Sequence, residues 1–223
     1  RFTISSTRGE AARLRDLAVD VGAGSYPPVT DLLIQRPRQP LQRISWQQVE
    51  RIDPNKRRVE VPDLAAAEPA QPAALERAVL LRRDILDALV LDLTNRSATL
   101  ANDLWLSEVE GHYALRAADI SAWAIVRRLS RGWLGQGADR NLLDWKHVEF
   151  LRGDPEAARE GGDYHRRVTR LQPAAIAHLV EAIPYVHAAE LLALLPDELA
   201  ADVLEDLAAE RQLQVFEEFP TEA

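Results

Sequence analysis

The chain has 223 residues, a formal net charge of −8 at neutral pH, five tryptophans, and neither cysteine nor methionine. Without cysteine it has no disulfide framework, no thiolate metal site and no thiol nucleophile. No apolar run is long enough to span a bilayer and no signal peptide is visible, so we expect a cytoplasmic location. Because the sequence starts at Arg1 and has no methionine, we expect it to be a piece of a longer protein or to lack its first residues, and a membrane part could then follow Ala223.

An internal repeat marks the first 150 residues. Asp16 and Gly24 recur as Asp103 and Gly111, at an offset of 87 residues. Further on, residues 45–50 (SWQQVE) match residues 144–149 (DWKHVE), at an offset of 99. The second copy has therefore gained twelve residues, which we place at 121–133. Ser121 is expected to cap a short helix there, with Trp123, Val126 and Leu129 on one face.

Each copy is predicted to consist mainly of short strands. β-Branched and aliphatic runs bounded by turn residues indicate the strands 17–21, 29–34, 59–61, 90–93, 104–106 and 113–115. Glu110 and Gly111 are typical of a tight hairpin. The pattern favours two small β-barrels or one sheet-rich pseudo-duplicate, in which Trp46 and Trp145 serve as core anchors. The glycines at 22 and 24, and at 135 and 137, belong to turns, because no phosphate-binding loop pattern surrounds them.

The C-terminal run 172–219 divides into four units of twelve residues. Apolar residues recur in three columns, and prolines stand near the unit boundaries, where a helix can begin but not continue. The columns are Leu179, Leu191, Val203 and Val215; Val180, Leu192, Leu204 and Phe216; and Ile183, Leu195, Leu207 and Phe219. One unit is too short to bury its apolar face alone, so the units are expected to stack as helical repeats.

The same run is strongly acidic, with ten carboxylate side chains against the single base Arg211, whereas residues 1–171 are nearly neutral. Glu198, Asp202 and Asp206 fall at i, i+4 and i+8 of one helix, with Glu205 beside them. A divalent cation would offset their repulsion, and Mg²⁺ prefers carboxylate oxygens together with retained water. The alternative is a solvated face in which the acids near the helix start are favoured by the helix dipole.

Other candidate sites are weaker. The pairs His178/Glu181 and His187/Glu190 have a spacing used in bundle metal sites, but ordinary surface or partly buried histidines are the favoured interpretation. Arg127, Arg128 and Arg131 form a basic patch that we expect to dock an acidic partner face, including the chain's own helical part; Arg57 and Arg58 form another. A nucleic-acid partner is not expected, because no basic domain is present. No triad spacing, nucleophile elbow or paired carboxylates indicate an enzyme.

Two known families resemble parts of this chain. Residues 15–34 and 44–49, and in the second copy 84–92, 101–104 and 143–148, resemble PRC-barrel domains. Residues 189–196 (AELLALLP) and 201–207 (ADVLEDL), followed by Glu210 and Arg211, resemble the cytoplasmic N domain of MgtE-type magnesium transporters. The resemblance implies an α+β multidomain fold of two small barrels at 1–62 and 75–151, linkers at 63–74 and 152–163, and a right-handed superhelix of short helices at 164–223.

In that family the N domain precedes a pair of CBS domains and a membrane channel, and Mg²⁺ between acidic faces holds the channel shut. The resemblance therefore implies a cytoplasmic regulatory module, or the cytoplasmic part of a membrane protein, with Glu198, Asp202, Glu205 and Asp206 as metal ligands. CBS or channel domains following residue 223 are the expected partners, and a homodimer is a further arrangement to test. The alternative function is a protein–protein interaction scaffold with no metal role.

Overall fold

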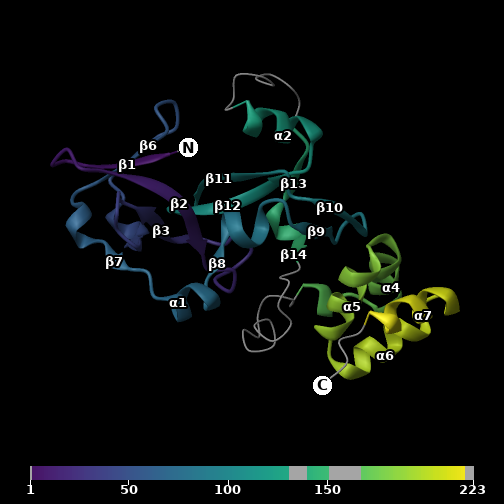
Figure 1. The fold of residues 1–223 in the computed structure, drawn as a ribbon. Coiled ribbons are helices and arrows are strands. Elements are labelled where there is room, and N and C mark those ends of the chain that lie inside the picture. Colours follow the sequence, from purple (N-terminus) through teal and green to yellow (C-terminus); the bar gives the residue numbers. More distant parts are fainter. Residues whose placement is uncertain (1, 131–139, 151–166, 219–223) are drawn as a thin grey trace.

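The architecture is mixed α+β in the computed structural model, which describes residues 2–130, 140–150 and 167–218 (Figure 1). Strands dominate the first two thirds of the chain and short helices form its C-terminal part, which confirms the predicted class. In the described ranges no helix combines the length and the apolar character that crossing a bilayer requires. The PRC-barrel assignment and the handedness of the helical stack stay predictions.

The first copy is one twisted sheet. Its strands are β1 (Thr3–Ser6), β2 (Ala11–Val19), β3 (Val29–Gln35), β4 (Leu41–Ser45), β5 (Arg51–Asp53), β6 (Arg58–Val61) and β7 (Glu68–Pro69). They pair in the order β5-β6-β1-β2-β3-β4-β7, and only β1 and β6 run parallel. Ile4, Leu32 and Ile34 are fully buried in its core.

The segment 63–74 connects the copies and is also part of this fold. A 3₁₀ turn, η2 (Leu64–Ala66), buries Leu64 completely, and β7 pairs with β4. The helix α1 (Pro72–Arg77) then leads into β8 (Val79–Leu80), which pairs with β2. The connection therefore packs against the first copy over most of its length.

The second copy consists of two three-stranded sheets. Its elements are a π-helical turn η3 (Leu81–Ile85), the strands β9 (Leu89–Asp92), β10 (Ser97–Leu100), β11 (Asp103–Val109), β12 (His112–Asp119), β13 (Leu142–Asp144) and β14 (Val148–Phe150), and the helix α2 (Ala122–Leu129). The sheets have the orders β10-β9-β14 and β11-β12-β13. Glu110 and Gly111 form the predicted hairpin turn, with φ of 51° and 81°, as a two-residue turn between twisted strands requires.

The internal repeat of the sequence reappears as matched local structures. Asp16 and Asp103 each accept a hydrogen bond from the backbone N–H of the following leucine. Ser45 and Asp144 each cap a 3₁₀ turn, η1 (Trp46–Gln48) and η4 (Trp145–His147). Trp145 is the core anchor predicted for its copy, at 2% exposure, whereas Trp46 is only half-buried.

Contacts from one copy complete the other. The carboxylate of Asp16 accepts the backbone N–H groups of Arg82 and Arg83, at 2.8 and 3.1 Å. The Tyr26 hydroxyl donates to the Asp144 carboxylate at 3.1 Å, and Val29 of β3 lies in the apolar core of the second copy. The two copies thus pack against each other and form one body.

Four short helices form the C-terminal stack: α4 (Pro173–Ala182), α5 (Tyr185–Ala193), α6 (Asp197–Glu205) and α7 (Ala209–Glu217). They begin twelve residues apart, as the sequence period predicts. α4 packs on α6 and α5 packs on α7. The first predicted column (Leu179, Leu191, Val203 and Val215) is completely buried. The second is buried only in its first half, since Phe216 is 57% exposed; Phe219 of the third lies outside the described residues.

The helical stack packs directly on the second copy. In β9, Val90 faces the core of the two strand-rich copies (residues 2–150, hereafter the barrel-like part), whereas its neighbour Leu91 belongs to the core of the helices. Successive side chains of a strand point to opposite faces, so this strand is buried on both sides and carries the continuous apolar run 89–91. The sheet β10-β9-β14 is therefore the wall that the two cores share; the predicted linker 152–163 lies outside the described residues.

Candidate functional site

The acidic face of the helical stack is exposed. Glu198, Asp202, Glu205 and Asp206 all lie on or directly after α6 with exposed side chains. In the part of the chain that the structure describes, no three acidic or histidine side chains converge closely enough to hold a metal ion. The four carboxylates thus form a surface that could contribute ligands, and α6 by itself does not assemble a closed coordination shell.

Arg211, the one base of the acidic run 172–219, makes its contacts away from the α6 carboxylates. The Arg211 guanidinium donates to the carbonyl of Val180 at 2.6 Å and to that of Ile183, and it lies 4.6 Å from the centre of the Tyr185 ring. The carbonyls at the end of α4 have no partner within their own helix, so Arg211 satisfies them. It consequently fastens α7 to α4 and leaves the acidic face without its local counter-charge.

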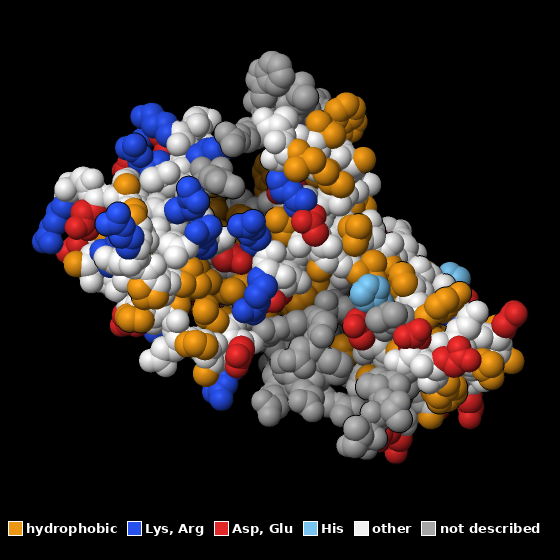
Figure 2. Space-filling model, in the orientation of Figure 1, with side chains coloured by type: hydrophobic (Ala, Val, Ile, Leu, Met, Phe, Trp, Pro, Cys, Tyr) orange, Lys and Arg blue, Asp and Glu red, His pale blue; other side chains and the backbone are white. Residues whose placement is uncertain are grey.

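No lysine or arginine forms an ion pair with the α6 carboxylates among the described residues. In Figure 2 the visible face of the helical stack carries acidic and histidine side chains, and the basic side chains gather on the barrel-like part. Like charges at i, i+4 repel each other by a few tenths of a kcal/mol per pair. The surface is therefore suited to a cation or to a basic partner.

The two histidine pairs do not form one site. His187 Nδ1 lies 2.9 Å from the Glu190 carboxylate on α5, whereas His178 and Glu181 are exposed on α4. No group of three potential ligands involves either pair among the described residues. The pair on α5 is an ordinary surface contact at spacing i, i+3.

Arg127 and Arg128 of α2 have intramolecular partners; docking of a partner face by this patch stays a prediction. Arg127 pairs with Asp119, and their side chains are 12% and 4% exposed. Arg128 pairs with Asp87 at 2.6 Å; Arg131 lies outside the described residues. Ser121 caps α2 as predicted, by accepting from the N–H of Ala124. Arg127 therefore holds α2 onto β12, where the buried Asp119 is the acceptor, and Arg128 links α2 to the exposed Asp87 just before β9.

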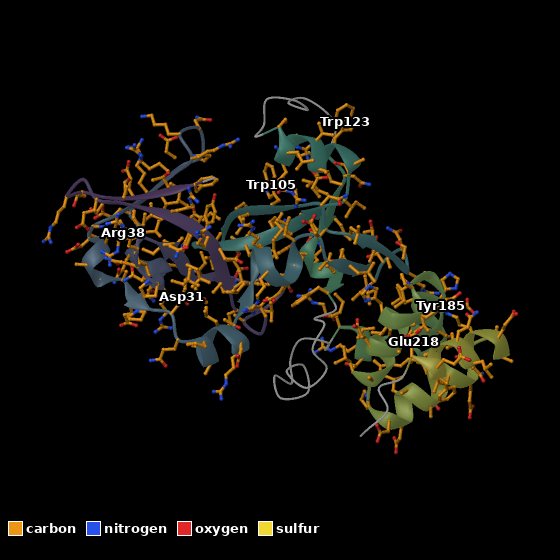
Figure 3. All side chains as sticks on the ribbon, viewed as in Figure 1. Asp31, Arg38, Trp105, Trp123, Tyr185 and Glu218 are labelled. Atoms are coloured by element: carbon orange, nitrogen blue, oxygen red, sulfur yellow. The ribbon has the colours of Figure 1, made fainter. Side chains whose placement is uncertain are left out.

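The inward position of the arginines turns the apolar side of α2 outward. Trp123 and Leu129 are 53% and 76% exposed, and Figure 3 shows Trp123 at the outer side of the helix. Only Ala124 of this helix is fully buried. The predicted shared face of Trp123, Val126 and Leu129 is consequently a surface feature and contributes little to the core.

Four further arginines on the first copy were not among the predicted basic patches. Arg13, Arg15, Arg36 and Arg38 line a groove beside β2 and β3. The sequence did contain a sign of this arginine-lined groove. Residues two apart in a strand share a face, and Arg13 and Arg15 stand on either side of the inward-facing Leu14. Arg15 donates to the Gln35 side chain at 2.6 Å.

A three-way junction joins the copies to the helices. The Arg167 guanidinium donates to the carbonyls of Trp145 and Val148 at 2.7 and 2.8 Å, and to that of Ser25 in the first copy at 3.1 Å. Glu149, 3% exposed, accepts the backbone N–H groups of Arg167 and Val168. These contacts position the turn η5 (Val168–Arg170), which precedes α4.

Burial raises the pKa of the Glu149 carboxyl to about 8, against the lowering effect of the Arg167 charge and of the two backbone N–H groups. The free-energy cost of desolvating the Glu149 carboxylate exceeds the stabilisation that the Arg167 charge and the two N–H groups provide. The junction between the barrel-like part and the helices thus contains a carboxyl group that keeps its proton near neutral pH.

The C-terminal part is therefore an acidic helical-repeat domain with a period of twelve residues, fastened to a pair of strand-rich copies. Residues 171–223 match the family model of the MgtE intracellular N domain, which confirms the resemblance predicted for this part of the chain. No curated protein and no solved structure matches the chain. The likeness of residues 1–151 to PRC-barrels stays a prediction.

Proposed function

We propose that this chain is a regulatory module of the MgtE type, acting in the cytoplasm. Its helical stack presents the carboxylates of α6, and a divalent cation, Mg²⁺, binds between this face and an acidic neighbour. CBS or channel domains of a longer protein are the natural neighbours, and a second copy of the chain is another. The family match at 171–223 supports the regulatory role.

The observation that carries the cation role is that no lysine or arginine of the described residues pairs with the α6 carboxylates. Glu198, Asp202, Glu205 and Asp206 are exposed, and the nearby Arg211 is used by the carbonyls at the end of α4. Magnesium keeps several waters and needs only one or two protein carboxylates, so an open face is compatible with binding. Because the helices pack on β9, a change in their packing on cation binding would be transmitted to the barrel-like part.

Calorimetric titration of the whole chain with millimolar MgCl₂, paired with thermal melts in Mg²⁺ and in EDTA, tests this proposal. We expect measurable heat and an upward shift in Tm with Mg²⁺, both reduced in Glu198→Gln/Asp202→Asn. Glu108→Gln, an exposed carboxylate on β11, is the matched control and should respond like the unmodified chain. Absence of heat and of any shift would favour the interaction scaffold, whose partner would stay bound in chelator.

A further inference from the structure

A cavity of about 580 Å³ lies between the two copies, away from the acidic face. Leu14, Leu17 and Trp46 of the first copy and Trp105, Leu106 and Tyr113 of the second line it. Figure 2 shows a hollow between the first copy and α2, and Figure 3 places Trp105 beside this space. This size lies within the range of pockets for small organic ligands.

The apolar lining remains accessible because β11 is irregular here. A bulge interrupts its pairing with β12 between Trp105 and Leu106, and a bulge re-aims side chains that would otherwise alternate. Consecutive residues of β11 thus face the same cavity, and Trp105 stays 39% exposed. Large aromatic surface left open in a concave site is typical of a binding site.

One end of the cavity is polar. Arg127 lines it from α2 and is already paired with Asp119, and its Nη1 is buried from solvent. Arg140 lies 4.2 Å from the centre of the Trp105 ring, so its charge is held over the aromatic wall. The exposed Arg140 guanidinium is therefore the donor that a bound acceptor group would meet.

The charge at this end favours an anion. The Asp119 and Arg127 charges offset each other, while Arg140 carries a full positive charge at the mouth. The remaining acid, Asp103, is half-buried, and burial raises the pKa of its carboxyl above the usual value, against the lowering effect of the Leu104 N–H and of Arg127 and Arg128. The charge that would attract an anion at this end is therefore that of Arg140.

We propose that this cavity binds a small, flat, apolar organic molecule with one anionic group, stacked on Trp105 and oriented by Arg140. The barrel-like part would then carry a ligand site of its own. This inference is independent of Mg²⁺ binding by the helices, since the cavity shares no residue with the α6 face.

The probe for the test is 1-anilinonaphthalene-8-sulfonate, which combines a flat aromatic body with one sulfonate and fluoresces when desolvated. Titration of the whole chain should give saturable binding with one molecule per chain. Trp105→Ala and Arg140→Gln should each weaken the Kd about tenfold, the equivalent of about 1.4 kcal/mol for a lost aromatic or charge-assisted contact. Both residues are exposed, so both variants should fold, which circular dichroism would verify.

The chain offers matched controls for both substitutions. Trp123→Ala removes an exposed tryptophan that does not line the cavity, and Arg116→Gln removes an arginine stacked on Tyr26 at 4.1 Å, also outside it. Both should keep the original Kd. The neutral analogue N-phenyl-1-naphthylamine should bind more weakly and be insensitive to Arg140→Gln. Unsaturable binding, or equal affinities in folded Trp105→Ala and Trp123→Ala, would overturn the site; equal affinities for the neutral and anionic probes would overturn the anion preference.

Discussion

Tyr113 stacks on Trp46, with ring centroids 5.3 Å apart and an angle of 24° between the ring planes. The two residues belong to different copies of the repeat, and Tyr26, the counterpart of Tyr113, contacts the Asp144 cap beside Trp145. Each copy therefore places its tyrosine on the tryptophan turn of the other. This reciprocity resembles the isologous contact of a two-fold dimer within one chain.

The stacked pair predicts how firmly the copies are joined. Tyr113→Ala should lower the free energy of unfolding by about 2–3 kcal/mol, because it removes a half-buried ring and its stacking partner's contact. Urea denaturation followed by circular dichroism measures this loss. Trp123→Ala, which removes an exposed ring on α2, should change stability by less than about 0.5 kcal/mol. Equal effects of the two changes would argue against a stabilising interface at Trp46.

The buried ion pair on α2 should be structural. Arg127→Met leaves Asp119 buried at 4% exposure without its counter-charge, so we expect a loss of about 3–5 kcal/mol. The double variant Arg127→Met/Asp119→Asn should recover part of this loss, because the stranded charge is gone. Denaturant unfolding of both variants checks the prediction, and a single variant as stable as the original chain would refute it.

Glu149 should make stability depend on pH. Its pKa is about 8 in the folded chain, raised from 4.5 by burial, so the folded state holds this proton after the unfolded state has lost it. Stability should therefore fall as pH rises from about 4.5 to about 8, by an amount on the order of a few kcal/mol, and then level off.

The variant Glu149→Gln keeps a carbonyl acceptor for Arg167 and Val168 but cannot ionise. Relative to the original chain, it should show a flatter profile between those pH values, with the largest gain in stability at pH 8. Chemical denaturation at several pH values provides the measurement. Parallel profiles for the two proteins would show that Glu149 does not ionise in this window.

Arg211 should hold the last helix in place. Arg211→Gln removes the hydrogen bonds to the carbonyls of Val180 and Ile183 and should cost about 2 kcal/mol, as charged hydrogen bonds typically contribute. Hydrogen exchange should rise in α7 more than in α4, because α7 is held at the end of the stack. The neighbouring exposed Glu210→Gln serves as control and should leave exchange in α7 unchanged.

Charge removal on α6 should stabilise the chain in the absence of metal. Asp202→Asn relieves repulsion from Glu198 and Asp206 at the i, i+4 spacing, worth a few tenths of a kcal/mol at low salt. The gain should shrink in high salt, because exposed charges are screened. Thermal melts at two salt concentrations measure it, and a destabilised variant would mean that Asp202 already has a favourable partner.

The period of the helical stack was predictable because its signal is local. Prolines and apolar columns at intervals of twelve recur within each unit, and the helices begin at that interval. The cap at Ser121 and the hairpin at Glu110 were predictable for the same reason, since capping and turn geometry involve only neighbouring residues. The repeat anchors Asp16 and Asp103 likewise marked equivalent backbone contacts in both copies.

Other features could not be read from the residues in order. The sequence predicted Arg127 and Arg128 as a patch that docks an acidic partner face, and only the position of α2 gives them the buried Asp119 and the exposed Asp87 as partners within the chain. The run 89–91 was recognisable as a strand, but not as the wall between two cores. Arg211 likewise gave no sequence sign that it would serve the end of α4.

The sequence by itself determined the elements of this protein, their repeats and the acidity of the last four units, because these properties depend on residues a few positions apart. The tertiary structure decided which charges are neutralised, which aromatic rings meet, and where a cavity stays open between the copies. Those outcomes join residues tens of positions apart, and their energies depend on burial and on the partners that packing brings within reach.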